Sequence, residues 1–174
     1  MSKATMSAVL ATVGLMLNIP AAGATALTAN GCKKGVFLTI SGRIGKITNN
    51  IDKTYELSER EFLALPTSTV TTSTPWTPKS EFVGPLFSDL LQVVAAKGNK
   101  MRLMALDNFS VEVDGDFLAR YGTILATTKD GVRMTVRDFG PIFVMFPRDR
   151  FRTELDTPVR ASNMVWQLCG IEVE

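Results

Sequence analysis

Short β-prone segments separated by turn residues recur along this chain, and no long stretch of helical periodicity lies between them. The clearest turn is Lys129-Asp130-Gly131, where an Asp-Gly pair between two β-prone segments predicts a hairpin. We expect about eight strands, and the main segments are 36–44, 55–57, 67–73, 101–106, 109–113, 123–127, 132–136, 141–146 and 164–174. Because strands do not alternate with long helices, the predicted fold class is α+β, with mixed β-sheets and short helices.

Three short helices are predicted between these strands. Ser58 and Glu61 form a capping box that starts a helix, and Pro66 stops it. Apolar residues recur at helical spacing over 86–94, and Asp114 is positioned to cap a third helix of one or two turns. Residues 74–85 hold three prolines and a glycine and are predicted to be a loop.

The composition bounds the chemistry. The chain has 174 residues, 45% of them hydrophobic, which suits one domain with a substantial core. A formal net charge of +2 provides no broad basic surface, so no nucleic-acid partner is expected. The absence of histidine removes the usual zinc and iron sites, histidine-dependent catalytic triads and the commonest general base.

The first 26 residues have the pattern of a secretory signal peptide. Lys3 precedes a short apolar run over 8–17, and small residues at 22–24 and 24–26 offer two candidate cleavage sites. We therefore expect one exported domain over 27–174. No later segment has the ~20 apolar residues that a membrane span needs, so no membrane insertion is expected.

Two cysteines remain in the exported domain, Cys32 near its start and Cys169 near its end. An oxidising compartment allows them to form a disulfide, which would contribute roughly 4–5 kcal/mol in the chain-entropy model. The alternative is two unpaired thiols, with Cys169 buried in a strand. The sequence leaves both open.

An ordered set of segments carries a family resemblance. "LTISGRI", "REFLALP", "TVTTSTPW", "FVGPLFSDLL", "MALDNFSVEV", "ILATTKDGVRMTVRDFGPIFVMFP" and "NMVWQLCGIEV" together resemble the sulfite-oxidase-type molybdopterin-binding domain. The resemblance covers roughly residues 36–174 and is nearest to the small exported branch of that family. It implies a sulfite-oxidase-like molybdopterin-binding fold with a pterin-sized pocket.

One departure from the family changes the expected activity. Catalytic members hold molybdenum through a cysteine thiolate at the end of the strand that matches 67–73, where this chain has only threonines and serines among its polar residues. A hydroxyl cannot replace a thiolate as a soft metal ligand. The arginine-rich stretch that follows in the family is replaced by Thr74-Pro75-Trp76. We therefore expect no redox catalysis.

Relatives of this cysteine-less type imply a signalling role. In that branch the protein binds a reduced pterin without molybdenum in the periplasm, and then acts on the periplasmic sensory domain of a membrane enzyme that makes or breaks cyclic di-GMP. A periplasmic pterin-binding protein of this kind is the main interpretation. The alternatives are a molybdopterin-dependent oxidoreductase subunit and an interaction domain that has kept only the fold.

A pterin is a flat bicycle that needs a stacking surface and polar partners along its edge. Trp76 is the predicted stacking wall, beside the hydroxyls of Thr72, Ser73 and Thr74. The competing interpretation is an edge strand with solvated threonines and a core tryptophan.

The family also suggests a binding role for the Asp107-Asn108-Phe109 turn. Relatives carry an Asn-Asp-Tyr-like triplet there, and the first two residues are exchanged in this chain. Either Asp107 or Asn108 is therefore a candidate partner for the amino edge of the pterin. Such residues are also common in turns for local reasons.

Two further regions match family positions near the ligand. Arg137, Asp138 and Gly140 precede an apolar strand, where an arginine could bond the heterocycle or simply pair with its neighbouring aspartate on the surface. Arg160 and Ser162 precede the last strand and could meet a phosphate or polyol tail, or lie in a solvated loop. Trp166 lies between Val165 and Gln167 and is expected to point into the core.

Overall fold

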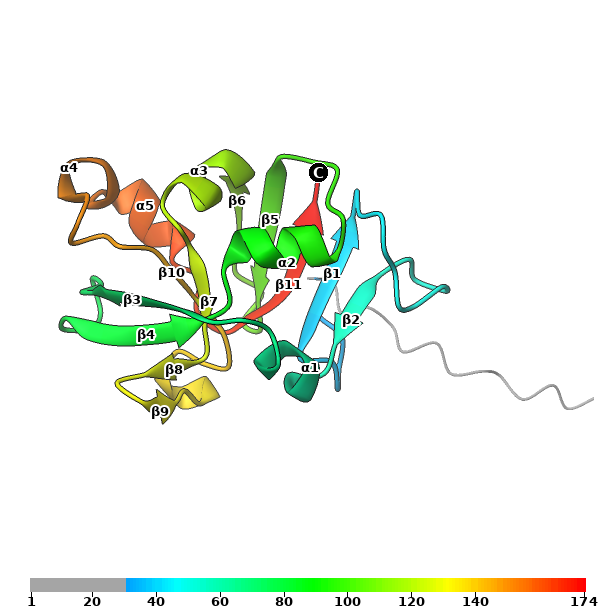
Figure 1. The fold of residues 1–174 in the computed structure, drawn as a ribbon, viewed down its shortest axis with the longest axis horizontal. Helices are drawn as coiled ribbons and strands as arrows, with labels where there is room; N and C mark the ends of the chain where they lie inside the picture. Colours follow the sequence, from blue (N-terminus) through cyan, green and yellow to red (C-terminus); the bar gives the residue numbers. More distant parts are fainter. Residues whose placement is uncertain (1–30) are drawn as a thin grey trace, which may run out of the picture.

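The computed structural model describes residues 31–174, so the predicted signal peptide over 1–26 lies outside the described residues. Three β-sheets and short helices make up this part of the chain (Figure 1). None of its helices is long and apolar enough to cross a membrane.

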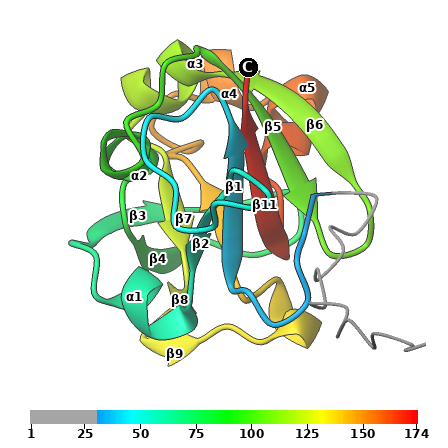
Figure 2. The ribbon, with the colours of Figure 1, turned by 90° about the vertical axis from the view of Figure 1, so that its right-hand side faces the viewer.

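The largest sheet has five strands and joins both ends of the described chain. Its strands, in spatial order, are β2 (Tyr55–Leu57), β1 (Leu38–Gly42), β11 (Leu168–Val173), β5 (Lys100–Ala105) and β6 (Ser110–Asp114). Strands β1 and β11 are parallel, whereas all other neighbours are antiparallel. Figure 2 shows β1 and β11 side by side in the middle of this sheet.

The other two sheets are smaller. The four-stranded sheet contains β3 (Ser68–Thr72), β4 (Ser80–Gly84), β8 (Thr128–Lys129) and β9 (Val132–Arg133) in that order. Strand β7 (Ile124–Ala126) pairs with β10 (Phe143–Met145). The predicted Asp130-Gly131 hairpin joins β8 to β9, and both turn residues have positive φ, as a tight hairpin turn requires.

Short helices close the remaining faces. They are α1 (Glu59–Leu63), α2 (Phe87–Val93), α3 (Gly115–Arg120), the 3-10 helix η1 (Val136–Asp138), α4 (Arg152–Leu155) and α5 (Pro158–Asn163). Helix α2 lies across one side of the five-stranded sheet, while α4 and α5 lie at the end of the molecule opposite β2 (Figure 1).

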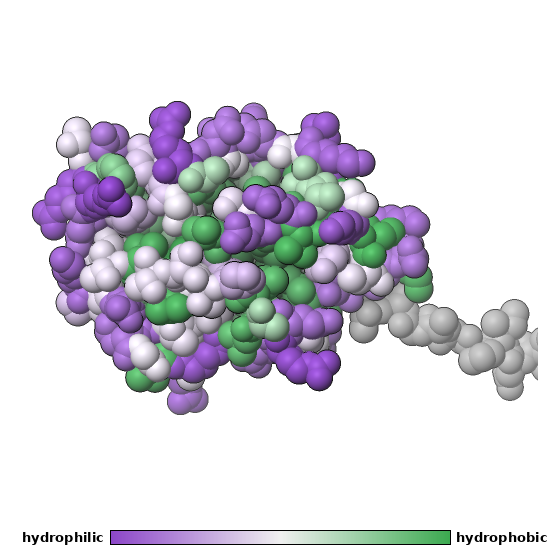
Figure 3. Space-filling view, in the orientation of Figure 1, coloured by the Kyte–Doolittle hydropathy of each residue, from purple (hydrophilic) through white to green (hydrophobic). Residues whose placement is uncertain are grey.

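The hydrophobic core is continuous across the three sheets. Phe82 of β4, Phe143 of β10 and Phe87 of α2 are fully buried and belong to one cluster. In the orientation of Figure 1 the surface is mainly polar, with apolar residues distributed between hydrophilic ones (Figure 3).

The two cysteines form a disulfide, which decides between the two alternatives left by the sequence. The Cα atoms of Cys32 and Cys169 lie 5.3 Å apart across 137 residues of sequence. The bond fixes the segment before β1 to the start of β11. Next to it, Lys33 is buried and pairs with Asp52 and Glu56.

Most predicted elements are confirmed, including the capping box at Ser58, but three regions differ from the predictions. The loop predicted over 74–85 is wrong in part, because 80–84 forms strand β4. The prolines of that stretch flank this strand, and Phe82 within it is buried. Helices α4 and α5 were not predicted, and 132–136 is only briefly a strand before η1.

Candidate functional site

A pocket of about 400 Å³ lies where three segments of the chain meet. The connection between β3 and β4 contributes Trp76, and the end of β5 with the turn after it contributes Ala105, Asp107 and Phe109. The third segment runs from α5 to the stretch before β11 and contributes lining residues within 158–166. The volume is within the range of small-molecule sites.

Two indole rings dominate the pocket wall. The ring centroids of Trp76 and Trp166 are 4.5 Å apart and nearly perpendicular, at 89°. Trp76 is 42% exposed, so much of its surface remains for a ligand to cover. Trp166 also packs against Phe139 and Phe143 of the hydrophobic core. Such a wall suits a flat, partly apolar ligand.

The position of Trp76 is set by buried threonines in its own turn. The Oγ1 atom of Thr74 accepts hydrogen bonds from the backbone N–H of Trp76 at 3.1 Å and of Thr77 at 2.9 Å. The hydroxyls of Thr74 and Thr77 are also bonded to each other, at 3.0 Å. The predicted site residue Thr74 therefore shapes the turn from beneath and does not line the pocket.

Thr72 and Ser73 attach the end of β3 to a distant turn. Asp149 accepts hydrogen bonds from the backbone N–H and the hydroxyl of Ser73, both at 2.7 Å. The Asp149 N–H donates to Oγ1 of Thr72 at 3.0 Å, and Arg148 donates to Oγ of Ser73. Burial acts to raise the pKa of Asp149, but the bonds from Ser73 and the nearby charge of Arg152 together outweigh it and hold that pKa below its ordinary value.

The hydroxyl groups at the end of β3 therefore have a structural role. Thr72 and Ser73 lie outside the pocket, and their hydroxyls are bonded within the protein. A structural hydrogen-bond network therefore occupies the end of β3. No group of three or more His, Cys, Asp or Glu side chains within residues 31–174 could hold a metal ion.

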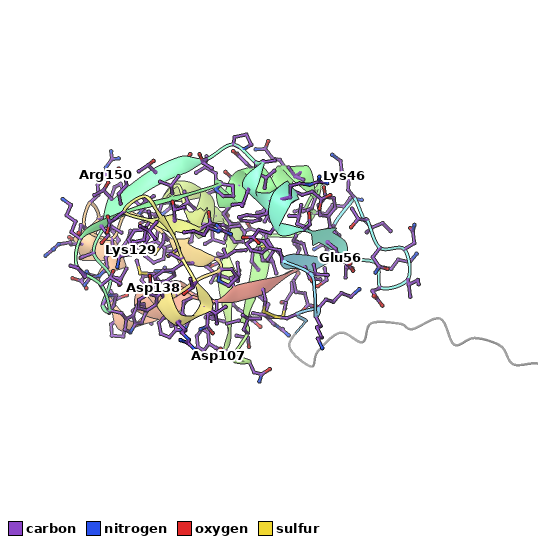
Figure 4. All side chains as sticks on the ribbon, turned by 90° about the horizontal axis from the view of Figure 1, so that it is seen from below. Lys46, Glu56, Asp107, Lys129, Asp138 and Arg150 are labelled. Carbon is purple, nitrogen blue, oxygen red and sulfur yellow. A yellow bond between two sulfur atoms is a disulfide. The ribbon has the colours of Figure 1, made fainter. Side chains whose placement is uncertain are left out.

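Asp107 lies on the rim of the pocket and Asn108 lies in the turn beside it. Figure 4 shows Asp107 at the outer edge of the molecule. One carboxylate oxygen accepts the backbone N–H of Phe109 at 2.9 Å, which closes the turn. Asn108 has φ of 71°, a left-handed conformation that asparagine tolerates well, and is not among the lining residues.

Arg137, Asp138 and Gly140 lie outside this pocket. The first two belong to the exposed helix η1. Gly140 is buried, and a Cβ at this position would lie only 2.4 Å from the carbonyl oxygen of Met134. The close contact of Gly140 is thus with the backbone of Met134, and this contact alone explains why a glycine is needed there.

Of the two candidate residues in α5, Ser162 lines the pocket and Arg160 does not. The guanidinium of Arg160 lies 3.9 Å from the ring centroid of Phe117 and donates to the Asn163 side chain at 3.3 Å, away from the pocket. Ser162 lines the pocket, and its hydroxyl donates to the carbonyl of Val159 at 2.7 Å. Asp107 and Ser162 are the two polar side chains of the lining.

The sequence reasoning missed Trp166 as a pocket residue. Expected in the core, Trp166 is only half-buried and forms part of the pocket wall. Gln167 has φ of 54° and its N–H donates to the carbonyl of Phe139, whose φ is 64°. The left-handed backbone at Gln167 breaks the alternation of the predicted strand just before β11 begins, and Trp166 lies at this break, where it lines the pocket. Nothing in the apolar pattern signals such a break.

The architecture is an α+β domain with the sulfite-oxidase-like molybdopterin-binding fold, as the sequence predicted. One solved structure with this fold is the sulfane dehydrogenase SoxCD from Paracoccus pantotrophus. It matches 78% of this chain with a TM-score of 0.57 and 14% sequence identity, and the chain spans 37% of that protein chain. The sequence matches no known family and no curated protein. At this identity the likeness concerns the fold alone.

Proposed function

We propose that this chain is a periplasmic pterin-binding protein without redox catalysis, which relays pterin availability to a membrane cyclic di-GMP enzyme. The observation that carries the proposal is the pocket with two tryptophans and two polar rim residues. An aromatic wall can stack against the bicycle. The Asp107 carboxylate can accept hydrogen bonds from the donor edge of a pterin, and the Ser162 hydroxyl can meet its polyol tail.

The same donor set does not fit the molybdenum centre associated with this fold. Both cysteines of the chain form the disulfide, so neither offers a thiolate. Thr72 and Ser73, at the matching strand end, already bond within the protein. Hydroxyls are also poor ligands for a soft metal site. An organic pterin is therefore the better candidate ligand, and no reaction step is assigned.

The likeness to a sulfane dehydrogenase favours one competing function, a molybdopterin-dependent oxidoreductase subunit. One sample of protein purified gently from the periplasm separates the two. Bound small molecules are released with acid, oxidised and identified by fluorescence chromatography, and molybdenum is measured in parallel. A pterin near one per protein without molybdenum supports the proposal, whereas stoichiometric molybdenum contradicts it.

Direct binding tests the site itself. Titration with 7,8-dihydroneopterin should quench the tryptophan fluorescence, because both tryptophans of the chain line the pocket. Trp76→Ala should weaken binding, whereas Glu154→Gln, an exposed carboxylate on α4, should not. Equal affinity of Trp76→Ala and the parent protein would place the ligand elsewhere. The relay is tested by adding loaded protein to membranes that contain the cyclic di-GMP enzyme and measuring its activity.

A further inference from the structure

The disulfide lies directly behind the floor of the pocket. Ala105 lines the pocket and pairs with Leu168 across strands β5 and β11. Cys169 follows Leu168, at the point where the register of these strands shifts. The Sγ atom of Cys169 is 3.3 Å from the carbonyl oxygen of Met104, and that of Cys32 is 4.0 Å from the carbonyl oxygen of Ala105. Both sulfurs thus contact the backbone at the end of β5, where Ala105 lines the pocket.

The packing around the disulfide lies outside the main core. Cys32, Met104 and Cys169 form a small buried cluster that is separate from the main core. At Gly31 the segment approaches so closely that a Cβ would lie 2.7 Å from the sulfur of Met104. The covalent bond joins the segment before β1 to β11 beside Met104, in a contact that lies outside the main core.

A second attachment holds the same segment on its other side. Lys33 pairs with Asp52 and Glu56, and the backbone N–H of Phe37 donates to the carbonyl of Leu57 at 3.0 Å. Loss of the disulfide removes the covalent link beside Met104 and leaves the segment attached through Lys33. The change is expected to be local, at the end of β5 and in the turn that carries Asp107.

We propose that the Cys32–Cys169 disulfide is a redox switch for the pocket. In the oxidised protein the pocket floor and the Asp107 turn are fixed, and ligand binds. A dithiol reductant opens the switch: its thiolate attacks one sulfur, the Cys32–Cys169 bond breaks, and its second thiol resolves the mixed disulfide. The two cysteines gain two electrons and two protons, and the dithiol leaves as its own disulfide. Binding then weakens because the floor is no longer held in place.

The position of the tryptophans supplies a readout that needs no ligand. The chain has two tryptophans, and both line the pocket in close perpendicular contact. Their coupled indoles should give an exciton couplet in far-ultraviolet circular dichroism, whose amplitude depends on their mutual geometry. Reduction with dithiothreitol should lower this amplitude and raise the Kd for 7,8-dihydroneopterin about tenfold, an ordinary size for coupling between two sites.

Two variants separate a local switch from a general loss of stability. The double variant Cys32→Ser/Cys169→Ser should resemble the reduced protein and should not respond to dithiothreitol. Leu90→Ala opens a cavity beneath α2, away from the pocket lining, and should lower thermal stability. In its oxidised form it should keep the full couplet and the parent affinity. If Leu90→Ala lowers both as much as reduction does, the switch is refuted.

The pterin part of this experiment rests on the proposed function, whereas the couplet does not. If 7,8-dihydroneopterin binds neither redox form, the proposed function fails. The redox switch is then tested by the circular-dichroism couplet alone. Reduction is verified by titration of the two thiols under native conditions. An unchanged couplet in protein with both thiols titratable overturns the proposal.

Discussion

Replacing Asp149 with asparagine tests whether the hydroxyl-rich end of β3 is a structural anchor. The Asp149 carboxylate is 17% exposed and accepts two hydrogen bonds from Ser73, each 2.7 Å long. It also lies 3.4 Å from the guanidinium of Arg152. Asparagine keeps the shape of the side chain but has only one oxygen, so its amino group must face one of the two donors of Ser73.

The expected loss follows from these contacts. A hydrogen bond to a charged group contributes about 1.5–3 kcal/mol, and the partial exposure of this carboxylate favours the low end through solvent screening. Asp149→Asn should therefore lower the free energy of unfolding by about 1.5 kcal/mol. In a domain of ~150 residues this corresponds to a Tm about 3–6 °C lower.

The pH dependence provides an independent check on the cause. Burial acts to raise the pKa of Asp149, but the bonds from Ser73 and the charge of Arg152 together bring it below its ordinary value in the folded protein. Its stabilisation is therefore present above the unfolded pKa of about 3.9. It is lost as the pH falls through the lower folded pKa, where the carboxylate is protonated in both states. The difference between the parent protein and Asp149→Asn should shrink accordingly on acidification.

Urea unfolding followed by circular dichroism measures this difference from about pH 7 down to about pH 3. Asp138→Asn is the matched control, because Asp138 is exposed in η1. A double-mutant cycle with Ser73→Ala assigns the coupling to this pair. The reasoning is refuted if Asp149→Asn costs no more than the control, or if its cost is independent of pH.

Three further predictions concern other parts of the molecule. Trp76→Ala should raise the Kd for 7,8-dihydroneopterin about tenfold, as expected for the loss of an aromatic stacking surface, and a fluorescence titration that gives the parent Kd would contradict it. Lys33→Met should lower the unfolding free energy by about 3 kcal/mol, because it leaves Glu56 without its cation; an unchanged Tm would contradict this. Hydrogen bonds to Asp52 and Glu56 raise the pKa of Lys33, so its contribution should persist below the ordinary lysine pKa and disappear as the pH rises through the higher folded value. Gly84→Ala should destabilise the protein by more than about 2 kcal/mol, since its Cβ would lie 2.0 Å from the carbonyl oxygen of Leu125; a normal urea midpoint would show that this contact relaxes easily.

Local signals predicted the elements that they control directly. Ser58 and Glu61 form the capping box that they encode, and the Asp130-Gly131 turn lies where its conformational preference places it. Strand β4 was missed because the prolines on both sides of residues 80–84 led to the prediction of a loop. Residues 80–84 form a strand because they pair with β3, the preceding strand, and with β8, which lies more than 40 residues further along the chain.

The site was less predictable, because it depends on contacts between distant segments. Trp76 and Asp107 were proposed and do line the pocket, but Trp166 was assigned to the core. Its direction depends on the left-handed backbone at Gln167, which no periodicity reveals. Helix α5 did carry a signal that was overlooked: Thr157 caps its N-terminus and Pro158 follows at its start.

The central position of β11 has a consequence for how the chain acquires its structure. This strand is the last one, yet it lies between β1 and β5 and pairs with both. The pair β2–β1 and the pair β5–β6 therefore cannot join into one sheet before Leu168–Val173 lies between them. A nascent chain must therefore remain without its central sheet until Leu168–Val173 has been synthesised, and a deletion of these few residues should abolish folding rather than weaken it.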